Sequence, residues 1–441
     1  MTTFKLTEDQ EKANVAFTDF LLDKEQNFLV ISGSAGTGKS TLVRHLLDTL
    51  HARMQLFSLL LADDENHQLD ICVAATTNKA ASVLADFLGY DVSTVHNKLG
   101  LVPRPNYTTG ETDFIKGRNH QIIHNTLFII DEASFISNSL FEDIKSSTVN
   151  CKIVLIGDQY QLAPVKQKIP IMNNPAFTRV SLNQIMRHGG AIAEAGARFK
   201  ETVETGIFTP IVPNGEDILH VDGPTFQQMI DEEFTHPEYT PEKARILAWT
   251  NSRVNQYNAH IREINGLDEH PTAGETLITN KPIISNKGQT LYCTDSLVKI
   301  EYTGYSCAQQ GVMGRYIAIK GINEAFLPDN QIDTMHLLKS LAKEKKWPNY
   351  FAIKQEWLDL RPIFASTVHK SQGSTYDTVY IDLTDIGKCN IASDVARLLY
   401  VAITRASKKV VLYGQLPLRY RGEQNERFTI TEAEATAPAS T

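Results

Sequence analysis

The segment GSAGTGKS, residues 33–40, constrains the fold of this 441-residue chain more than any other feature. It follows the apolar run NFLVISG, precedes helical text and fits the pattern GxxxxGK[ST]. In that pattern, glycines let backbone N–H groups surround phosphates, the lysine reaches the β- and γ-phosphates, and the serine oxygen binds Mg²⁺. We therefore expect an α/β fold, ATP and Mg²⁺ as cofactors, and nucleotide contacts from Gly33, Ser34, Ala35, Gly36, Thr37, Gly38, Lys39, Ser40 and Thr41.

Two later apolar runs also end in polar residues suited to triphosphate chemistry. In TLFIIDEAS, we expect Asp131 to hold Mg²⁺ with Ser40, and Glu132 to polarise the attacking water. In CKIVLIGDQ the strand ends at Asp158, and Gln161 follows at a spacing that lets its amide sense the γ-phosphate. The catalytic candidates are thus Lys39, Asp131, Glu132 and Gln161. They predict an NTPase, a class that includes kinases, transporters and motors.

The apolar runs fall into two series, which predict two α/β units with buried parallel strands. The first contains NFLVISG, DICVAATT, TLFIIDEAS and CKIVLIGDQ, and the second contains ARILAWTNS, IFASTVHKS, TVYIDLTD and KVVLYGQ. Residues 98–124 and about 276–360 interrupt the alternation and are interpreted as insertions, the second β-rich and then helical. The low-complexity tail, 416–441, is expected to be partly disordered.

Composition narrows the cellular setting. No apolar run reaches the roughly 18 residues that a membrane span needs, and the N-terminus does not resemble a signal peptide. The 5 cysteines are scattered without a CxxC pair, which favours reduced thiols over zinc or disulfides. We therefore expect a cytoplasmic protein. The net charge of −8 implies that any nucleic-acid surface is local.

The order GSAGTGKST, AATTNKAA, STVHNKLG, IIDEAS, GDQYQLAPV, STVHKSQGST and LYVAITRASKK resembles the superfamily 1B helicases, and among them the RecD-like and phage Dda-type enzymes. The resemblance covers roughly residues 6–412. It implies two RecA-like P-loop NTPase lobes: residues 1–190 with a pin insertion at 98–124, and residues 191–275 with 361–415. It also implies an SH3-like β-barrel with a helical extension at 276–360.

The resemblance extends the nucleotide site. Gln10, within the capping pattern Thr7-x-x-Gln10, matches the residue that reads the adenine edge. Arg187 and Arg405 match the arginines that reach the γ-phosphate from the second lobe. Gln372 and Gly373, in the polar loop ASTVHKSQGST, face the nucleotide in this comparison.

The same comparison assigns strand contacts. The matching DNA-binding candidates are Thr77, Asn78, Thr94, His96, Asn251, Thr367 and His369, with Ser366, Lys370 and Asn255 beside them. The sequence departs from the Dda-type pattern at residues 76–78, which read TTN instead of PTH. A plain amphipathic helix remains an alternative for the segment around Asn251.

The two insertions carry separate expectations. NYTTGETDF predicts a short hairpin, with Tyr107 and Phe114 on either arm and Phe114 as the DNA-separating residue of a pin. Tyr107 or Ile115 could serve instead. The alternation in SLVKIEYTG and RYIAIKG suits a small barrel. Lys343, Lys345 and Lys346 are interpreted as a solvated helix face.

By resemblance the function is an ATP-dependent 5′-to-3′ DNA helicase that acts on single-stranded and tailed duplex DNA, in phage replication or recombination and hence in the host cytoplasm. The expected state is a monomer, with a single-strand-binding or other replication protein as a further partner. The alternative is an ATP-driven translocase or protein-displacing remodeller without strong unwinding. A helicase–nuclease subunit is disfavoured, because no clustered acidic nuclease motif follows residue 412.

Overall fold

The structure is a computed structural model that describes residues 5–34, 36–61, 69–162, 171–184, 190–285 and 290–422, with side chains described to residue 55 in the second range. Two predicted site residues, Ala35 and Arg187, lie outside the described residues, as does the predicted tail beyond residue 422. Within the described ranges, no helix combines the length and apolar character that crossing a membrane requires.

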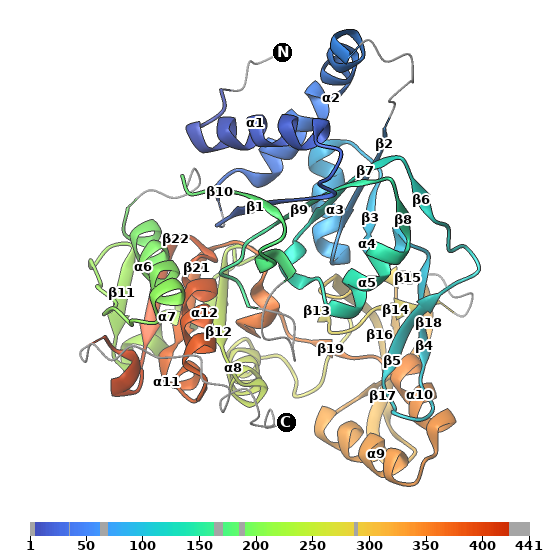
Figure 1. Ribbon diagram of the computed structural model, residues 1–441. Helices are drawn as coiled ribbons and strands as arrows, with labels where there is room; N and C mark the ends of the chain where they lie inside the picture. The colour runs from blue at the N-terminus through green and yellow to red at the C-terminus, as the bar shows by residue number, and fades with distance from the viewer. Residues whose placement is uncertain are drawn as a thin grey trace.

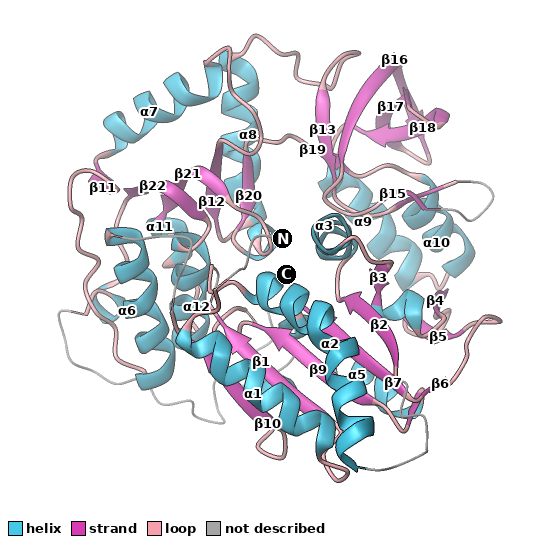
Figure 2. Cartoon of the chain, turned by 90° about the horizontal axis from the view of Figure 1, so that it is seen from above, coloured by secondary structure: helices cyan, strands magenta, loops and turns pink. Residues whose placement is uncertain are grey.

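The first lobe is built on a 6-stranded parallel sheet with the order β10-β1-β9-β7-β2-β3. The strands are β1 (Phe28–Gly33), β2 (Asp70–Ala75), β3 (Val92–Thr94), β7 (Thr126–Asp131), β9 (Lys152–Gly157) and β10 (Thr178–Leu182). One face is covered by α1 (Glu8–Leu22), α2 (Lys39–Leu61) and α3 (Asn78–Leu88), and the other by α4 (Val95–Lys98) and α5 (Asn138–Ser146) (Figure 2). The short pair β6 (Ile123–His124) and β8 (Thr148–Val149) lies outside this sheet.

The second lobe is built on a 5-stranded parallel sheet with the order β11-β22-β21-β12-β20. The strands are β11 (Ile218–Val221), β12 (Ala244–Ala248), β20 (Ala365–Thr367), β21 (Tyr376–Asp382) and β22 (Ala406–Tyr413). One face is covered by α6 (Ala191–Thr205), α11 (Leu383–Ile386) and α12 (Ala392–Ile403), and the other by α7 (Gly223–Thr235) and α8 (Asn251–Ile264). The prediction of two α/β units with buried parallel strands is confirmed.

An antiparallel sheet interrupts the second lobe in the chain, with the order β18-β17-β16-β13-β19. Its strands are β13 (Thr276–Thr279), β16 (Leu297–Gln309), β17 (Val312–Ile319), β18 (Ile322–Pro328) and β19 (Leu360–Arg361), with the pair β14 (Ile283–Ile284) and β15 (Thr290–Tyr292) nearby. Two helices, α9 (Gln331–Lys343) and α10 (Trp347–Glu356), pack on this sheet through Phe326 and Trp357. Burial along β17 changes sides of the strand: Val312 packs with α9 and α10, whereas Ile317 and Ile319 belong to a separate core within the antiparallel sheet.

The first-lobe insertion contains two antiparallel strands, β4 (Leu101–Pro105) and β5 (Thr112–Lys116), hereafter the hairpin. Its register pairs Pro103 with Phe114. Tyr107 lies in the connecting turn and not on an arm, which differs from the sequence prediction. Figure 1 shows the hairpin running beside α10, far from it in sequence. A Cβ at Gly110 would lie 2.6 Å from the Trp347 ring, so the turn approaches α10 closely.

Candidate active site at the junction of the lobes

The phosphate-binding segment joins the end of β1 to the start of α2, as predicted. Gly36 and Gly38 have φ angles of 83° and 76°, in the left-handed region that glycine adopts readily. A Cβ at Gly38 would lie only 2.5 Å from Gln10 Nε2. The loop can therefore curl against α1 only with glycine at this position, which leaves its backbone N–H groups available to phosphate.

Two side chains support the loop from inside the first lobe. Lys39 Nζ donates to the carbonyls of Gly33 (2.7 Å) and Ser34 (3.0 Å), which keeps the ammonium over the loop. Gln10 is buried, and its Nε2 donates to Thr37 O (3.3 Å) while its Oε1 accepts from Thr7 N (3.0 Å). The predicted capping box is thus confirmed. The same amide braces the phosphate loop, so Gln10 has a role there that the sequence did not predict.

The predicted acidic pair lies at the end of β7. Glu132 has a left-handed φ of 51°, its N–H donates to Asp131 Oδ1 (2.9 Å), and its carbonyl accepts from Thr76 Oγ1 (2.9 Å). Burial raises the pKa of Glu132 to about 7, with a further contribution from the charge of Asp131, while Lys39 and Arg405 act in the opposite direction. Charges from both lobes therefore converge on this carboxylate.

The oxygen donors beside the loop fit Mg²⁺ bound together with nucleotide phosphates. Ser40 offers a hydroxyl and Asp131 a carboxylate, both of them ligand types that Mg²⁺ prefers. Glu132 Oε2 is buried and has no hydrogen-bond partner within the described ranges, and burial raises the pKa of Asp131, so negative charge is poorly compensated here. Among the described residues there is no group of at least 3 His, Cys, Asp or Glu that could hold a metal by itself. That agrees with a cation that keeps phosphate and water ligands.

Arg405 brings the second lobe to the same place. It is buried, and it donates from Nη1 to Ser374 O (3.1 Å) and from Nε to Val401 O (3.2 Å). The charge of Glu132 acts on Arg405 across the lobe boundary. Ser374 Oγ in turn accepts from Lys79 Nζ of α3 (2.7 Å). Lys79 and Ser374 are not among the predicted site residues, although they lie inside the segments AATTNKAA and STVHKSQGST.

The loop that contains Gln161 lies between the lobes. Gln161 is buried, and its Oε1 has no partner among the residues that the structure describes. With its amide oriented to satisfy both ends, Gln372 accepts from Leu162 N (3.1 Å) and donates to His369 O (3.2 Å). Gly373, with φ of 75°, follows at once. The polar loop of the second lobe thus contacts the Gln161 segment directly, a contact that the sequence did not predict.

The predicted strand-contact residues lie mostly at helix N-termini. Thr77 caps α3 and Thr94 caps α4, while Asn251 begins α8. Asn78, Asn251 and His369 are exposed, as strand contacts need to be. Thr367 is buried at the end of β20, and its Oγ1 accepts from Lys370 N (3.4 Å), so its side chain shapes the loop.

The hairpin contacts both the first lobe and the antiparallel sheet's helices. The Phe114 ring lies 4.1 Å from the half-buried His96 ring, measured between centroids, and remains 47% exposed. At the turn, Tyr107 packs edge-on against Phe351 of α10 at 5.3 Å. A predicted strand-contact residue and the predicted separating residue are therefore neighbours.

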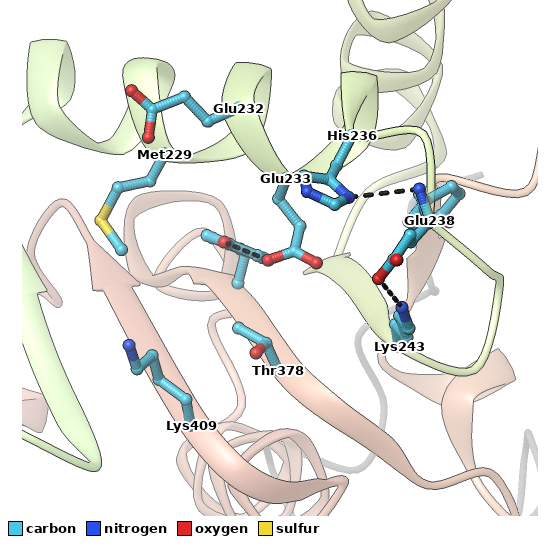
Figure 3. Close-up of a pocket in the computed structure, with 10 residues that line it drawn as sticks. Met229, Glu232, Glu233, His236, Glu238, Lys243, Thr378 and Lys409 are labelled. Carbon is cyan, nitrogen blue, oxygen red and sulfur yellow. Dashed lines mark hydrogen bonds and ion pairs between the residues drawn. The ribbon is translucent and has the colours of Figure 1, made fainter.

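A separate pocket of about 440 Å³ lies between α7 and the sheet of the second lobe (Figure 3). Some of its charged residues have partners. Lys243 Nζ lies 3.6 Å from Glu238 Oε2, and the Tyr380 hydroxyl donates to Glu233 Oε2 at 3.4 Å. None of the predicted site residues lines this pocket, and it is not part of the lobe junction.

The comparisons with known proteins match both lobes. A family model described as an AAA domain matches residues 5–206, and a UvrD-like helicase C-terminal domain matches residues 362–413. The ATP-dependent DNA helicase dda of Enterobacteria phage T4 is 24% identical over 459 residues, covering 92% of this chain and 98% of the relative. The ATP-dependent RecD2 DNA helicase of Deinococcus radiodurans is 22% identical, covering 86% and 46% respectively. The solved structure of a Bacteroides Pif1 helicase with ADP-AlF3 and ssDNA aligns with a TM-score of 0.49 at 14% identity, covering 95% of this chain and 94% of that one.

The relatives and the geometry agree on one assignment. The phosphate loop, the acidic pair and the buried arginine meet between two parallel α/β lobes, in the motif order that characterises these enzymes. A helicase relative aligns over almost the whole chain, so the likeness is not confined to the phosphate loop. The chain is an ATP-hydrolysing helicase, similar to the superfamily 1B enzymes among its relatives.

Proposed function

We propose that the protein is an ATP-dependent DNA helicase that moves 5′-to-3′ on single-stranded DNA and unwinds duplex. The observation that carries this proposal is the pair of bonds at Ser374, whose hydroxyl accepts from Lys79 and whose carbonyl accepts from Arg405. Lys79 follows the strand-contact candidates Thr77 and Asn78, and Arg405 faces Glu132. One residue therefore links the proposed DNA path to the proposed hydrolysis site.

The proposed catalytic roles follow from this geometry. Lys39 and the backbone of residues 33–38 hold the phosphates, and Glu132 accepts a proton from the attacking water. Arg405, approaching from the second lobe, stabilises charge that develops during phosphoryl transfer. Ser40 and Asp131 would hold Mg²⁺, which when bound would neutralise phosphate charge. Because the groups come from two lobes, hydrolysis depends on how closely the lobes approach.

The hairpin is proposed as the element that separates the strands. Opening one base pair costs on the order of 1–2 kcal/mol of stacking, and one base–aromatic stack is worth roughly 1–3 kcal/mol. The exposed part of Phe114 can supply that stack. The turn packs on α10, so the hairpin is supported at its tip as well as at its base. Because an element that separates strands must be rigid, this support favours duplex unwinding over translocation along single strands alone.

The finer assignments are proposals of the same kind. They include the SH3-like character of the antiparallel sheet, the domain bounds given above, a role in phage replication or recombination, a cytoplasmic site of action, a monomeric state, and a single-strand-binding partner. The 5′-to-3′ polarity rests on the family resemblance. An alternative, a translocase that displaces proteins without unwinding, shares every residue of the junction.

A strand-displacement assay tests the proposal. Duplexes with a 5′ tail, a 3′ tail or blunt ends are incubated with ATP and Mg²⁺, and released strand is measured. Release from the 5′-tailed duplex alone is expected. Release from the 3′-tailed duplex alone contradicts the polarity. If no duplex is opened while single strands stimulate ATP hydrolysis, the translocase alternative is correct.

A further inference from the structure

The segment Asp158–Leu162 belongs to the first lobe in sequence but packs into the second lobe. It follows β9 directly, yet Tyr160 and Leu162 are buried in the same hydrophobic core as Phe199 of α6 and Leu399 of α12. The Tyr160 hydroxyl donates to Glu204 of α6, and Lys200 Nζ lies 4.9 Å above its ring. This segment, here called the sensor turn, is therefore held by side chains of the opposite lobe.

Two residues of α12, one helical turn apart, form hydrogen bonds to the sensor turn. One bonds to its backbone carbonyls and the other to the Asp158 carboxylate. Arg397 Nη1 donates to the carbonyls of Gln159 (2.7 Å) and Gln161 (2.8 Å). The Tyr400 hydroxyl donates to Asp158 Oδ2 (2.6 Å), while Asp158 Oδ1 accepts from Tyr160 N (3.0 Å). Both ends of the turn are thus bonded to one helix of the second lobe.

The turn presents one unpaired group. Gln161 is 3% exposed, and its Oε1 finds no partner in the part of the chain that the structure describes. A buried amide oxygen accepts hydrogen bonds, and one without a partner costs roughly as much as a lost hydrogen bond, so the arrangement favours a donor such as water at that point. Arg397 donates to the backbone carbonyl of Gln161. Its guanidinium therefore fixes the backbone position from which the Gln161 side-chain amide extends.

Residues of α12 also lead to the proposed hydrolysis site. The helix ends at Ile403, and Arg405 Nε donates back to Val401 O. Arg397 lies in the middle of this helix and Tyr400 in its last turn, and the buried arginine follows the same C-terminal end. A movement of the second lobe shifts the arginine and the glutamine together.

We propose that Arg397 and Tyr400 are positioning residues that tether the sensor turn to α12, so that Gln161 and Arg405 approach the γ-phosphate as one unit. This inference rests on the proposed function, because it presumes that Gln161 contacts the γ-phosphate. It adds the means by which closure of the second lobe completes the site. Neither residue contacts the nucleotide in this account.

Arg397→Met tests the tether, because it keeps the length of the side chain and removes its donors. Two hydrogen bonds from a charged group are lost, so kcat of strand-stimulated ATP hydrolysis is expected to fall about tenfold or more. ADP affinity should stay within about twofold, because ADP lacks the phosphate that Gln161 senses. Affinity for ADP with aluminium fluoride should fall in parallel with kcat. Tyr400→Phe removes a hydroxyl that bonds to Asp158 and also interacts with Ser34 of the phosphate loop, and it should lower kcat to a smaller extent.

Matched controls separate positioning from general stability. Arg419→Met changes an exposed arginine whose Nη2 donates to Asn390 within the second lobe (3.3 Å). Tyr420→Phe removes a buried hydroxyl that donates to Cys389 O of the same lobe (3.4 Å). Both should leave kcat and the affinity ratio of the two ADP complexes unchanged. Equal losses in the controls and in Arg397→Met overturn the tether.

A double-mutant cycle gives the sharpest decision. If Arg397 acts through Gln161, then Gln161→Ala with Arg397→Met should be about as slow as Gln161→Ala alone. The proposal is overturned if kcat of the double variant falls by the product of the two single losses. It is also overturned if kcat is unchanged in both Arg397→Met and Tyr400→Phe. A parent protein whose ATP hydrolysis does not respond to single-stranded DNA instead contradicts the proposed function, and so the two failures are distinguishable.

Discussion

Glu132 lies in a left-handed backbone conformation, which costs a residue with a Cβ roughly 1–2 kcal/mol. The carbonyl of Glu132 accepts from Thr76 and its N–H donates to Asp131, and these two bonds hold that conformation. The conformation directs toward charges from both lobes a carboxylate, one oxygen of which has no partner among the residues described. A local strain of this kind fits a proton-accepting role.

Glu132→Gln should retain ATP binding and lose ATP hydrolysis by about 10²–10⁴-fold, the usual contribution of a general base. Lys39→Ala should lose turnover as well, with weaker ATP binding, because the ammonium that holds the phosphates is removed. Filter binding of a non-hydrolysable ATP analogue and steady-state hydrolysis with single-stranded DNA measure the two effects. Near-normal hydrolysis in Glu132→Gln shows that another group accepts the proton.

His369→Ala should weaken stimulation of ATP hydrolysis by single-stranded DNA more than it weakens ATP binding. The side chain is exposed at the end of a loop whose neighbours Thr367 and Ser371 are buried. Loss of one such contact should raise the DNA concentration for half-maximal stimulation about three- to tenfold. His336→Ala, at an exposed position on α9, is the control. Identical titrations of His369→Ala and parent make His369 an incidental loop residue.

At the scale of elements, the sequence predicted what is contiguous in the chain. The strands that end at Gly33, Asp131 and Gly157, and the loop after β20, are each one apolar run followed by polar residues. Their positions follow from that local pattern. The hairpin was also predicted, but not its register: β4 ends at Pro105, which puts Tyr107 in the turn.

Contacts between elements were not predictable in the same way. The bond from Lys79 to Ser374 joins residues 295 positions apart, and the bond from Arg397 to Gln159 spans 238 positions. Such pairs depend on how two complete lobes pack, and no periodicity in one segment encodes that. Gln10 shows the same limit, since its buried contact with the phosphate loop needs α1 placed against that loop.

Phe114→Ala should slow duplex unwinding strongly while sparing ATP hydrolysis and movement along single strands. Its ring rests on His96 and is otherwise open to a terminal base pair. Tyr305→Ala is a suitable control, because this ring is 94% exposed on another strand, β16. Stopped-flow unwinding measures the effect. Loss of all three activities makes Phe114 a structural residue, and loss of none places the separating residue elsewhere.

Reversing the charge of Lys343, Lys345 and Lys346 together should change single-strand affinity by less than about twofold. All three are exposed near the end of α9, and Lys346 already pairs with Glu344 at 2.7 Å. Exposed pairs of this kind contribute little. Fluorescence anisotropy with a labelled oligonucleotide measures the affinity. A large loss shows that the helical extension of the antiparallel sheet contacts DNA.

At the scale of the molecule, the account describes a motor whose hydrolysis site is complete only when two lobes meet. Arg405 belongs to the second lobe, against which the sensor turn with Gln161 packs, while the phosphate loop and Glu132 belong to the first. In the proposed function each nucleotide state favours its own lobe spacing, and single-stranded DNA bound across both lobes would respond to the change. Because the net charge is −8, any surface that binds a strand must be local. A path lined by hydroxyls, amides and helix N-termini agrees with that charge.

The most direct test of this account is displacement of streptavidin from a biotinylated single strand. Two oligonucleotides of the same sequence carry biotin at the 3′ or the 5′ end, and release is followed with ATP and Mg²⁺. The account predicts rapid release from the 3′ end only, and no release by Glu132→Gln. Release from the 5′ end alone, or release that Glu132→Gln supports equally well, contradicts ATP-driven 5′-to-3′ movement.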